Sequence, residues 1–191
     1  LALHDSLTAL PNRENLRLTL RRVLENCLRG DERSAILCFD LDGFKRVNDA
    51  FGHAAGDDVL RCVARRVSRI ARDGDTVACM GGDEFAGIVR NLQHPREAGL
   101  IASRIIEAIE APIKAAGHMV GVGASVGIAL APAHGTACDD LLKCADLALY
   151  QAKAGGKGMF RFFERQMNER LMQRQTLEQD LASAVRNREF V

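Results

Sequence analysis

The 191-residue sequence has no tryptophan, almost no net charge and no long apolar segment. No apolar run approaches the ~18 residues of a membrane span, and none has the pattern of a signal peptide. The formal net charge is +1, so no global electrostatic field favours nucleic acid or an anionic membrane as a partner. Any charged ligand must therefore be bound by a local arrangement of residues.

The sequence also lacks paired cysteine motifs. Of its six cysteines none forms a C-x-x-C pair, and their scatter fits no zinc-binding pattern. Since several lie in apolar stretches, we expect reduced thiols and a cytoplasmic location for this domain. Position 1 opens directly onto a domain start, which indicates a piece of a longer protein whose sensor or membrane anchor would lie upstream.

The apolar patterns predict one α/β (α+β) domain with an appendage. Stretches with helical spacing alternate with short β-rich runs. Two of those runs flank Gly81 and Gly82, whose freedom to take positive φ favours a β-hairpin, so we expect a sheet of mixed direction. Helices are predicted over residues 12–28, 56–71, 96–111 and 139–154, the last capped by Asp139 or Asp140. Strands are predicted over residues 34–41, 76–80, 85–89, 118–130 (as one strand or two) and 159–163.

The composition changes after Phe163. Residues 164–191 are mostly polar and helix-favouring, whereas residues 1–163 hold all the predicted strands. We therefore divide the chain into a domain over residues 1–163 and a helical linker over residues 164–191.

Two acidic clusters are the strongest candidates for chemistry. Asp40 and Asp42 end a predicted strand, and alternation places both carboxylates on one side with the Leu41 carbonyl between them. Asp83 and Glu84 stand at the tip of the predicted hairpin. Such oxygen ligands suit Mg²⁺, which commonly shares its shell with substrate phosphates. Taken singly, either cluster also fits solvated acidic residues at an ordinary strand end or hairpin tip.

In order and spacing, the motifs resemble those of the GGDEF-domain diguanylate cyclases. The resemblance implies a fold shared with polymerase palms and nucleotide cyclases, in which helices flank a central sheet and the active site lies on a β-hairpin. It also implies an enzyme that joins two GTP molecules into cyclic di-GMP. The matching segments are HDSLTALPNR at residues 4–13, FDLDGFKRVNDAFGHAAGDDVL at 39–60, GGDEF at 81–85, SVGIA at 125–129, ADLALYQAK at 145–153 and RFF at 161–163.

The resemblance assigns roles to individual residues. It implies that Asp40, the Leu41 carbonyl and Asp83 hold Mg²⁺ or Mn²⁺, with Asp83 and Glu84 as the catalytic carboxylates. One domain would bind one GTP, so a transient homodimer with two-fold symmetry is needed for the product. The family's R-x-x-D pattern, at which cyclic di-GMP binds and inhibits, is matched by Arg72 and Asp75.

Substrate binding is assigned in the same way. Guanine recognition falls on Asn48 and Asp57, whose amide and carboxylate can pair with the edge of the base. Adenine would leave these groups unpaired, so the site is expected to reject it. Two alternatives to these binding roles stay open. The lysines can be solvated surface charges, and His53 can form a local structural hydrogen bond. The further GTP-binding positions are Phe44, Lys45, His53, Gly81, Gly82, Lys153 and Lys157.

The chain departs from the family's pattern at two places. Cys79 stands where the family usually has arginine. Gly156-Lys157-Gly158 stands where the family has Gly-Arg-Asn. The lysine keeps the positive charge of the arginine but loses its ability to form two parallel hydrogen bonds to a phosphate. Residues 177–191 resemble the helix that leads into an EAL phosphodiesterase domain, which would begin just beyond Val191. The alternative function is therefore a catalytically weak GTP-binding module that regulates such a neighbour. A purely structural dimerisation module would not need guanine-type polar groups beside two acidic clusters.

Overall fold

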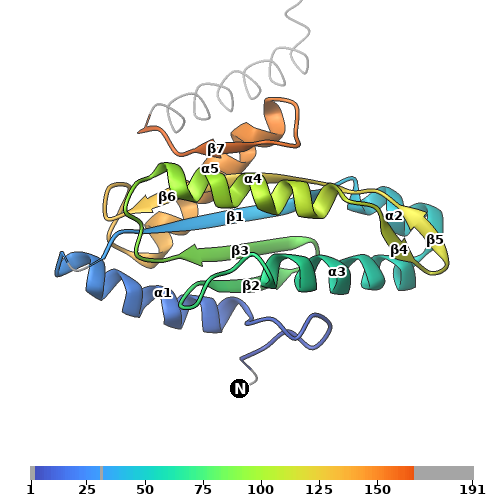
Figure 1. Ribbon diagram of the computed structural model, residues 1–191, viewed down its shortest axis with the longest axis horizontal. Helices are drawn as coiled ribbons and strands as arrows, with labels where there is room; N and C mark the ends of the chain where they lie inside the picture. The colour runs from blue at the N-terminus through green and yellow to red at the C-terminus, as the bar shows by residue number, and fades with distance from the viewer. Residues whose placement is uncertain (1–2, 31, 166–191) are drawn as a thin grey trace, which may run out of the picture.

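A five-stranded sheet in the order β2-β3-β1-β6-β7 forms the centre of the molecule (Figure 1). The computed structural model describes residues 3–30 and 32–165, so all of the predicted linker except residues 164 and 165 lies outside the described residues. Of the four pairings in this sheet only β6–β7 is parallel, which confirms the mixed direction expected from the hairpin. The strands are β1 (Ser34–Asp42), β2 (Thr76–Gly81), β3 (Glu84–Val89), β6 (Gly123–Ala131) and β7 (Phe160–Phe162).

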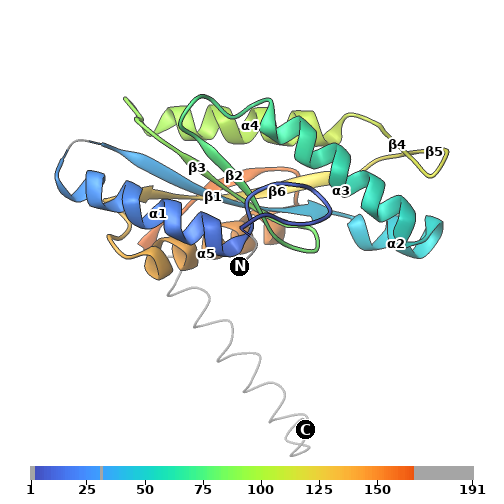
Figure 2. The same cartoon turned by 90° about the horizontal axis from the view of Figure 1, so that it is seen from below.

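Helices cover both faces of this sheet (Figure 2). One face carries α3 (His53–Ser68) and α4 (Arg96–Glu110), and the other carries α1 (Arg13–Leu28) and α5 (Cys138–Ala154). Alternation along the central strand β1 supplies both cores: Leu37 and Phe39 pack on the α3–α4 side, whereas Ile36 and Cys38 pack on the α1–α5 side. The predicted α/β class is confirmed.

Three details differ from the sequence-based expectation. A separate helix α2 (Phe44–Phe51) precedes α3, and its two-turn apolar stripe is too short to stand out inside a motif rich in polar groups. Strands β4 (Ile113–Ala115) and β5 (His118–Val120) form a small separate ribbon.

The third difference concerns the start of α5. The N-cap position is Ala137 and no side chain caps the helix, so the expected caps Asp139 and Asp140 were wrong. Both aspartates lie in the first turn instead, where negative charge is favourable near the helix dipole. Asp139 also forms an ion pair of 2.6 Å with Arg17 on α1.

The fold brings the two acidic clusters together. In the β1–β3 register Asp40 is paired with Glu84, and the Leu41 amide donates to the Asp83 carbonyl at 3.3 Å. Gly81 and Gly82 have φ values of +131° and +58°, which side-chain-bearing residues rarely adopt, so the glycines permit this turn. The clusters therefore lie side by side on neighbouring strands, at the end of the sheet where α2 begins (Figure 1).

An ion pair between Glu32 and Arg90 joins the segment before β1 to the segment after β3, away from these acids. Glu32, with a side chain only 3% exposed, accepts two hydrogen bonds of 2.8 Å from Arg90 and one of 2.7 Å from Ser34. The hydrogen bonds from Arg90 lower the pKa of Glu32 from 4.5 to about 2. In the described residues, no helix has the length and apolar character needed to cross a membrane.

Candidate active site

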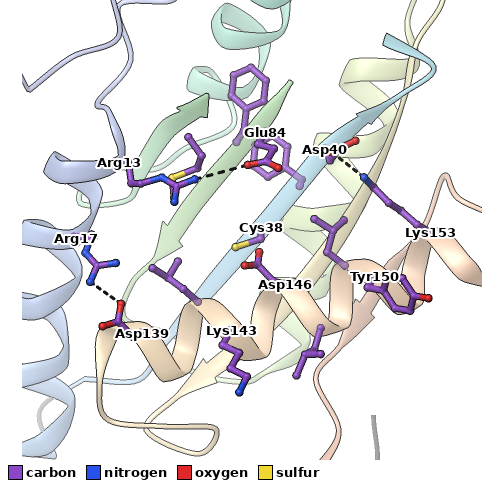
Figure 3. Close-up of a pocket in the computed structure, with 16 residues that line it drawn as sticks. Arg13, Arg17, Cys38, Asp40, Glu84, Asp139, Lys143, Asp146, Tyr150 and Lys153 are labelled. Atoms are coloured by element: carbon purple, nitrogen blue, oxygen red, sulfur yellow. Dashed lines mark ion pairs between the residues drawn. The ribbon is translucent and has the colours of Figure 1, made fainter. Parts of the chain in front are cut away.

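Asp40 is a largely buried carboxylate at the centre of the site. Its side chain is 17% exposed, and one of its oxygens lies 2.8 Å from the Lys153 ammonium of α5 (Figure 3). Burial raises the pKa of Asp40, as do the nearby charges of Asp83 and Asp42, whereas the Lys153 hydrogen bond opposes the rise. A second positive charge beside this acid would relieve its repulsion with Asp83.

A cavity of about 650 Å³ lies between α1, α5 and the sheet, with Asp40 and Glu84 in its wall (Figure 3). The Arg13 guanidinium of α1 lies 3.9 Å from Glu84, and both side chains are about 60% exposed. This contact is therefore a weak, solvent-screened attraction. Of the residues predicted to hold the metal only Asp40 lines this cavity, and Asn48 and Asp57 do not line it.

Asp42 has a different set of partners from Asp40. Its Oδ2 accepts a hydrogen bond of 2.7 Å from the fully buried Ser125 and one of 3.2 Å from the Gly158 amide. Residues 156 to 158 all have positive φ, and Lys157 is the exposed middle residue. The carboxylate of Asp42 thus holds the turn that carries Lys157. These partners are far apart in sequence, so the strand pattern carried no signal for them.

The predicted guanine-binding residues lie on α2 and at the start of α3. Asn48 and Asp57 are half-buried, and His53 and Lys45 are exposed. Phe44 is buried in the core beneath them. The polar members of this set therefore lie on two helices that pack against one another, with Phe44 buried in the core.

Gly56 lies between Asn48 on α2 and Asp57 on α3. A Cβ built on Gly56 would lie 2.0 Å from the Asn48 amide oxygen. Sequence reasoning gave Gly56 no role, because a glycine inside a helical pattern carries no sign of what fills its space.

The R-x-x-D residues lie at the opposite end of β2 from the Gly81-Gly82 turn. Asp75 accepts a 3.0 Å hydrogen bond from each of the Arg72 and Arg90 amides, and the Arg72 guanidinium lies 3.5 Å from Glu97. Six strand residues separate the two ends, which corresponds to roughly 20 Å. The predicted product site is thus distinct from the acidic clusters, and the Arg72 side chain is 56% exposed.

Cys79, which stands at a departure from the family's pattern, is buried. Burial raises the pKa of its thiol, and the negative charge of Asp5 adds to the rise. A neutral, buried thiol therefore stands where the family usually has a positive charge.

The oxygen donors of the site fit a hard divalent cation. Among the described residues there is no group of three or more His, Cys, Asp or Glu side chains placed to hold a metal. Asp40, Asp83 and the Leu41 carbonyl nevertheless provide two carboxylates and one main-chain oxygen, from the end of β1 and from the β2–β3 turn beside it. Mg²⁺ commonly binds to one or two carboxylates together with substrate phosphates, so this donor set suits it.

Comparison with known protein families is consistent with this arrangement. The family described as "Diguanylate cyclase, GGDEF domain" matches residues 2–159. The chain belongs to this family. The match covers helices α1 to α5, every strand of the sheet except β7, and every residue assigned above.

Relatives from Pseudomonas aeruginosa carry several kinds of name. The bifunctional diguanylate cyclase/cyclic di-GMP phosphodiesterase MucR is 41% identical over 191 residues, which are 100% of this chain and 28% of MucR. The cyclic di-GMP phosphodiesterase NbdA is 39% identical over 187 residues, which are 98% of this chain and 24% of NbdA. The chain thus spans less than a third of the length of these two relatives.

The diguanylate cyclase TpbB of the same organism is also similar. It is 43% identical over 162 residues, which are 84% of this chain and 37% of TpbB. A structure comprising only the GGDEF domain of TpbB superposes with a TM-score of 0.86 at 41% identity, covering 88% of this chain and 99% of that one. The GGDEF fold of this chain is therefore shared with a solved GGDEF domain.

Proposed function

We propose that this GGDEF domain condenses two GTP molecules into cyclic di-GMP and two pyrophosphates. The observation that carries the proposal is the pairing of Asp40 with Glu84 across β1 and β3, with Asp83 in the β2–β3 turn and Lys153 at 2.8 Å from Asp40. This arrangement places several acids and a cation at the end of the sheet where β1 leads into α2, the helix that carries Asn48. The names of MucR and TpbB support the same activity.

Base and phosphates are bound by different parts of the site. Asn48 and Asp57 pair with guanine, with His53 near the base or ribose. Exposed Gly81 and Gly82 let the nucleotide approach the hairpin backbone closely. The phosphates are bound by the lysines of three segments, namely Lys45, Lys153 and Lys157.

Asp40, Asp83 and the Leu41 carbonyl would hold Mg²⁺ or Mn²⁺. Such a cation stabilises charge on the phosphates and lowers the cost of hydroxyl deprotonation. In each half-reaction a ribose 3′-oxygen bonds to the α-phosphorus of the other GTP, the bond to the pyrophosphate oxygen breaks, and the hydroxyl proton passes to a carboxylate. Asp83 or its neighbour Glu84 takes that proton.

Two copies of the chain are needed for this reaction. Each binds one GTP, and the copies meet face to face with two-fold symmetry so that each 3′-hydroxyl reaches the other α-phosphate. Dimer encounter is therefore the control point. We further propose that cyclic di-GMP binds at Arg72 and Asp75, roughly 20 Å from the turn, and inhibits the reaction by restricting that encounter.

A second candidate is a GTP-binding module that regulates a neighbouring EAL-like domain joined through residues 164–191. Two features favour it: the neutral thiol of Cys79 and the lack of a side chain at Gly158. The phosphodiesterase name of NbdA is consistent with a neighbour of that kind.

Product formation separates the two candidates. The chain is incubated with GTP and Mg²⁺ at high protein concentration, beside an Asp83→Ala variant, and both samples are analysed for cyclic di-GMP by mass spectrometry and for GTP binding. Product from the unaltered chain and none from the variant is the result expected of a cyclase. GTP binding without product, in a sample shown to form dimers, would contradict the cyclase proposal and support the regulatory module.

A further inference from the structure

Helices α2 and α3 approach one another closely at Gly56. A Cβ built on this residue would lie 2.0 Å from the Asn48 amide oxygen and 3.1 Å from the Phe44 ring. Even alanine therefore cannot be accommodated there without movement of a neighbour. Because the terminal amide of Asn48 is the nearest and most mobile of these neighbours, it is the group that would move.

The amide oxygen of Asn48 is buried, and no described residue donates a hydrogen bond to it. Buried polar atoms without partners are rare in folded proteins and need an explanation. Here the oxygen fills the space that a Cβ would take, against the backbone of Gly56. The two end atoms of a planar amide diverge, so the Nδ2 amine is turned away from Gly56.

The backbone itself does not require glycine at this position. Gly56 lies in the first turns of α3 and has no positive φ, unlike Gly52 just before the helix, whose φ is +81°. Glycine is among the least favourable residues in a helix interior. Glycine at this position is therefore explained by the space that the Asn48 amide occupies, and not by the backbone conformation of the helix.

We propose that Gly56 is a specificity-determining residue, which fixes the Asn48 amide so that its amine faces the base beside the Asp57 carboxylate. A donor next to an acceptor matches the O6 and N1–H groups of guanine, whereas adenine carries the opposite order of donor and acceptor. The inference rests on the proposed function, in that Asn48 and Asp57 are taken to bind the base of GTP. It adds the residue that sets the orientation of the amide.

The test compares Gly56→Ala with a matched glycine variant. Gly99 is a buried glycine of α4 whose added Cβ would meet the Phe160 ring at 3.3 Å, and neither residue belongs to the proposed site. Dissociation constants for GTP and ATP and the thermal midpoint are measured for the unaltered chain, Gly56→Ala and Gly99→Ala. We expect Gly56→Ala to lower GTP affinity by roughly 10- to 100-fold with ATP affinity unchanged, the range set by leaving polar groups of the site unpaired. Gly99→Ala should retain the GTP/ATP ratio of the unaltered chain.

Several outcomes would overturn the inference. A folded Gly56→Ala variant that keeps the GTP/ATP ratio within about twofold contradicts it, as does an equal loss of the ratio in Gly99→Ala. If the unaltered chain shows no preference for GTP, the proposed function itself fails, and this outcome is distinct because it precedes any substitution.

A double-mutant comparison keeps the test decisive if Gly56→Ala does not fold. In an Asn48→Ala background the clashing amide is absent, so adding Gly56→Ala should leave the GTP/ATP ratio where Asn48→Ala alone puts it. A further fall in the ratio in the double variant would mean that Gly56 acts through another neighbour, and the inference would be rejected.

Discussion

The α2–α3 side and the β1–α5 side of the site are built from different interactions. On the first, Asn48 is held by packing against Gly56, and its oxygen has no donor among the described residues. On the second, Asp40 is ion-paired with Lys153, and Asp42 is hydrogen-bonded to Ser125 and Gly158. Shape thus sets the orientation of the proposed base-binding group, whereas charge organises the proposed phosphate side.

This difference has a physical consequence. A packed amide changes little with salt or pH, because no charge is involved. An ion pair such as Asp40–Lys153 is instead available for exchange, since an arriving cation can replace the ammonium as the partner of the carboxylate. Substrate selection and metal-dependent chemistry can therefore be perturbed separately, and the following variants are designed to do so.

Asp40→Asn should give the largest effect, because it removes the negative charge of the Asp40 carboxylate from the proposed phosphate side at almost constant side-chain volume. We expect turnover to fall by roughly 100- to 1000-fold, the usual loss when one charge-stabilising group is removed. The GTP/ATP binding ratio should stay as in the unaltered chain. Cyclic di-GMP formation and nucleotide affinities measure the two quantities, and a lost ratio would contradict the division of roles.

Glu32→Gln tests a charge that serves only the scaffold. The free energy of unfolding should fall by roughly 2–4 kcal/mol, since the variant leaves Arg90 without its buried ion-pair partner. The pKa of Glu32 is lowered from 4.5 to about 2, so its contribution is complete above pH 4.5 and is lost as pH falls through about 2.

Denaturant unfolding of both chains between pH 2 and pH 7 measures this contribution. The two stability curves should be separated at neutral pH and converge in acid. A constant separation would show that the carboxylate charge is not the source of the stability difference.

Asp42→Ala should loosen the turn that carries Lys157. We expect GTP affinity to fall about 10-fold while affinity for guanosine stays unchanged, because the lost hydrogen bonds act on a phosphate-side residue. Asp42→Asn, which retains an acceptor oxygen, should recover part of the affinity. Equal losses for GTP and guanosine would indicate general unfolding of the site, and calorimetric titrations with both ligands distinguish the cases.

Ionic strength should produce the smallest change. Raising salt from 50 to 500 mM is expected to weaken GTP binding several-fold, because exposed lysines attract phosphates through a screened field. The GTP/ATP ratio should not move, since both nucleotides carry the same phosphates. A GTP/ATP affinity ratio that changes with salt would contradict the inference that packing of Asn48 against Gly56 sets the choice of base.

The sequence allowed the local parts of this account to be predicted. The hairpin, the central strand and the mixed sheet follow from short-range patterns, whereas the meeting of the two acidic clusters was expected only from the resemblance to the GGDEF family. The partners of Asp42 could not be predicted, because Ser125 and Gly158 reach it only through the order of strands in the sheet. Gly56 was missed for a related reason: the space it leaves exists only once α2 and α3 are packed.

The most direct measurement is product analysis with GTP and ATP supplied together in equal amounts with Mg²⁺. The account predicts cyclic di-GMP as the cyclic product, with no product that contains adenine. Mixed or adenine-only cyclic dinucleotides would contradict the assignment of Asn48, Gly56 and Asp57 to guanine. No cyclic product from a sample that binds GTP and forms dimers would contradict the proposed condensation itself.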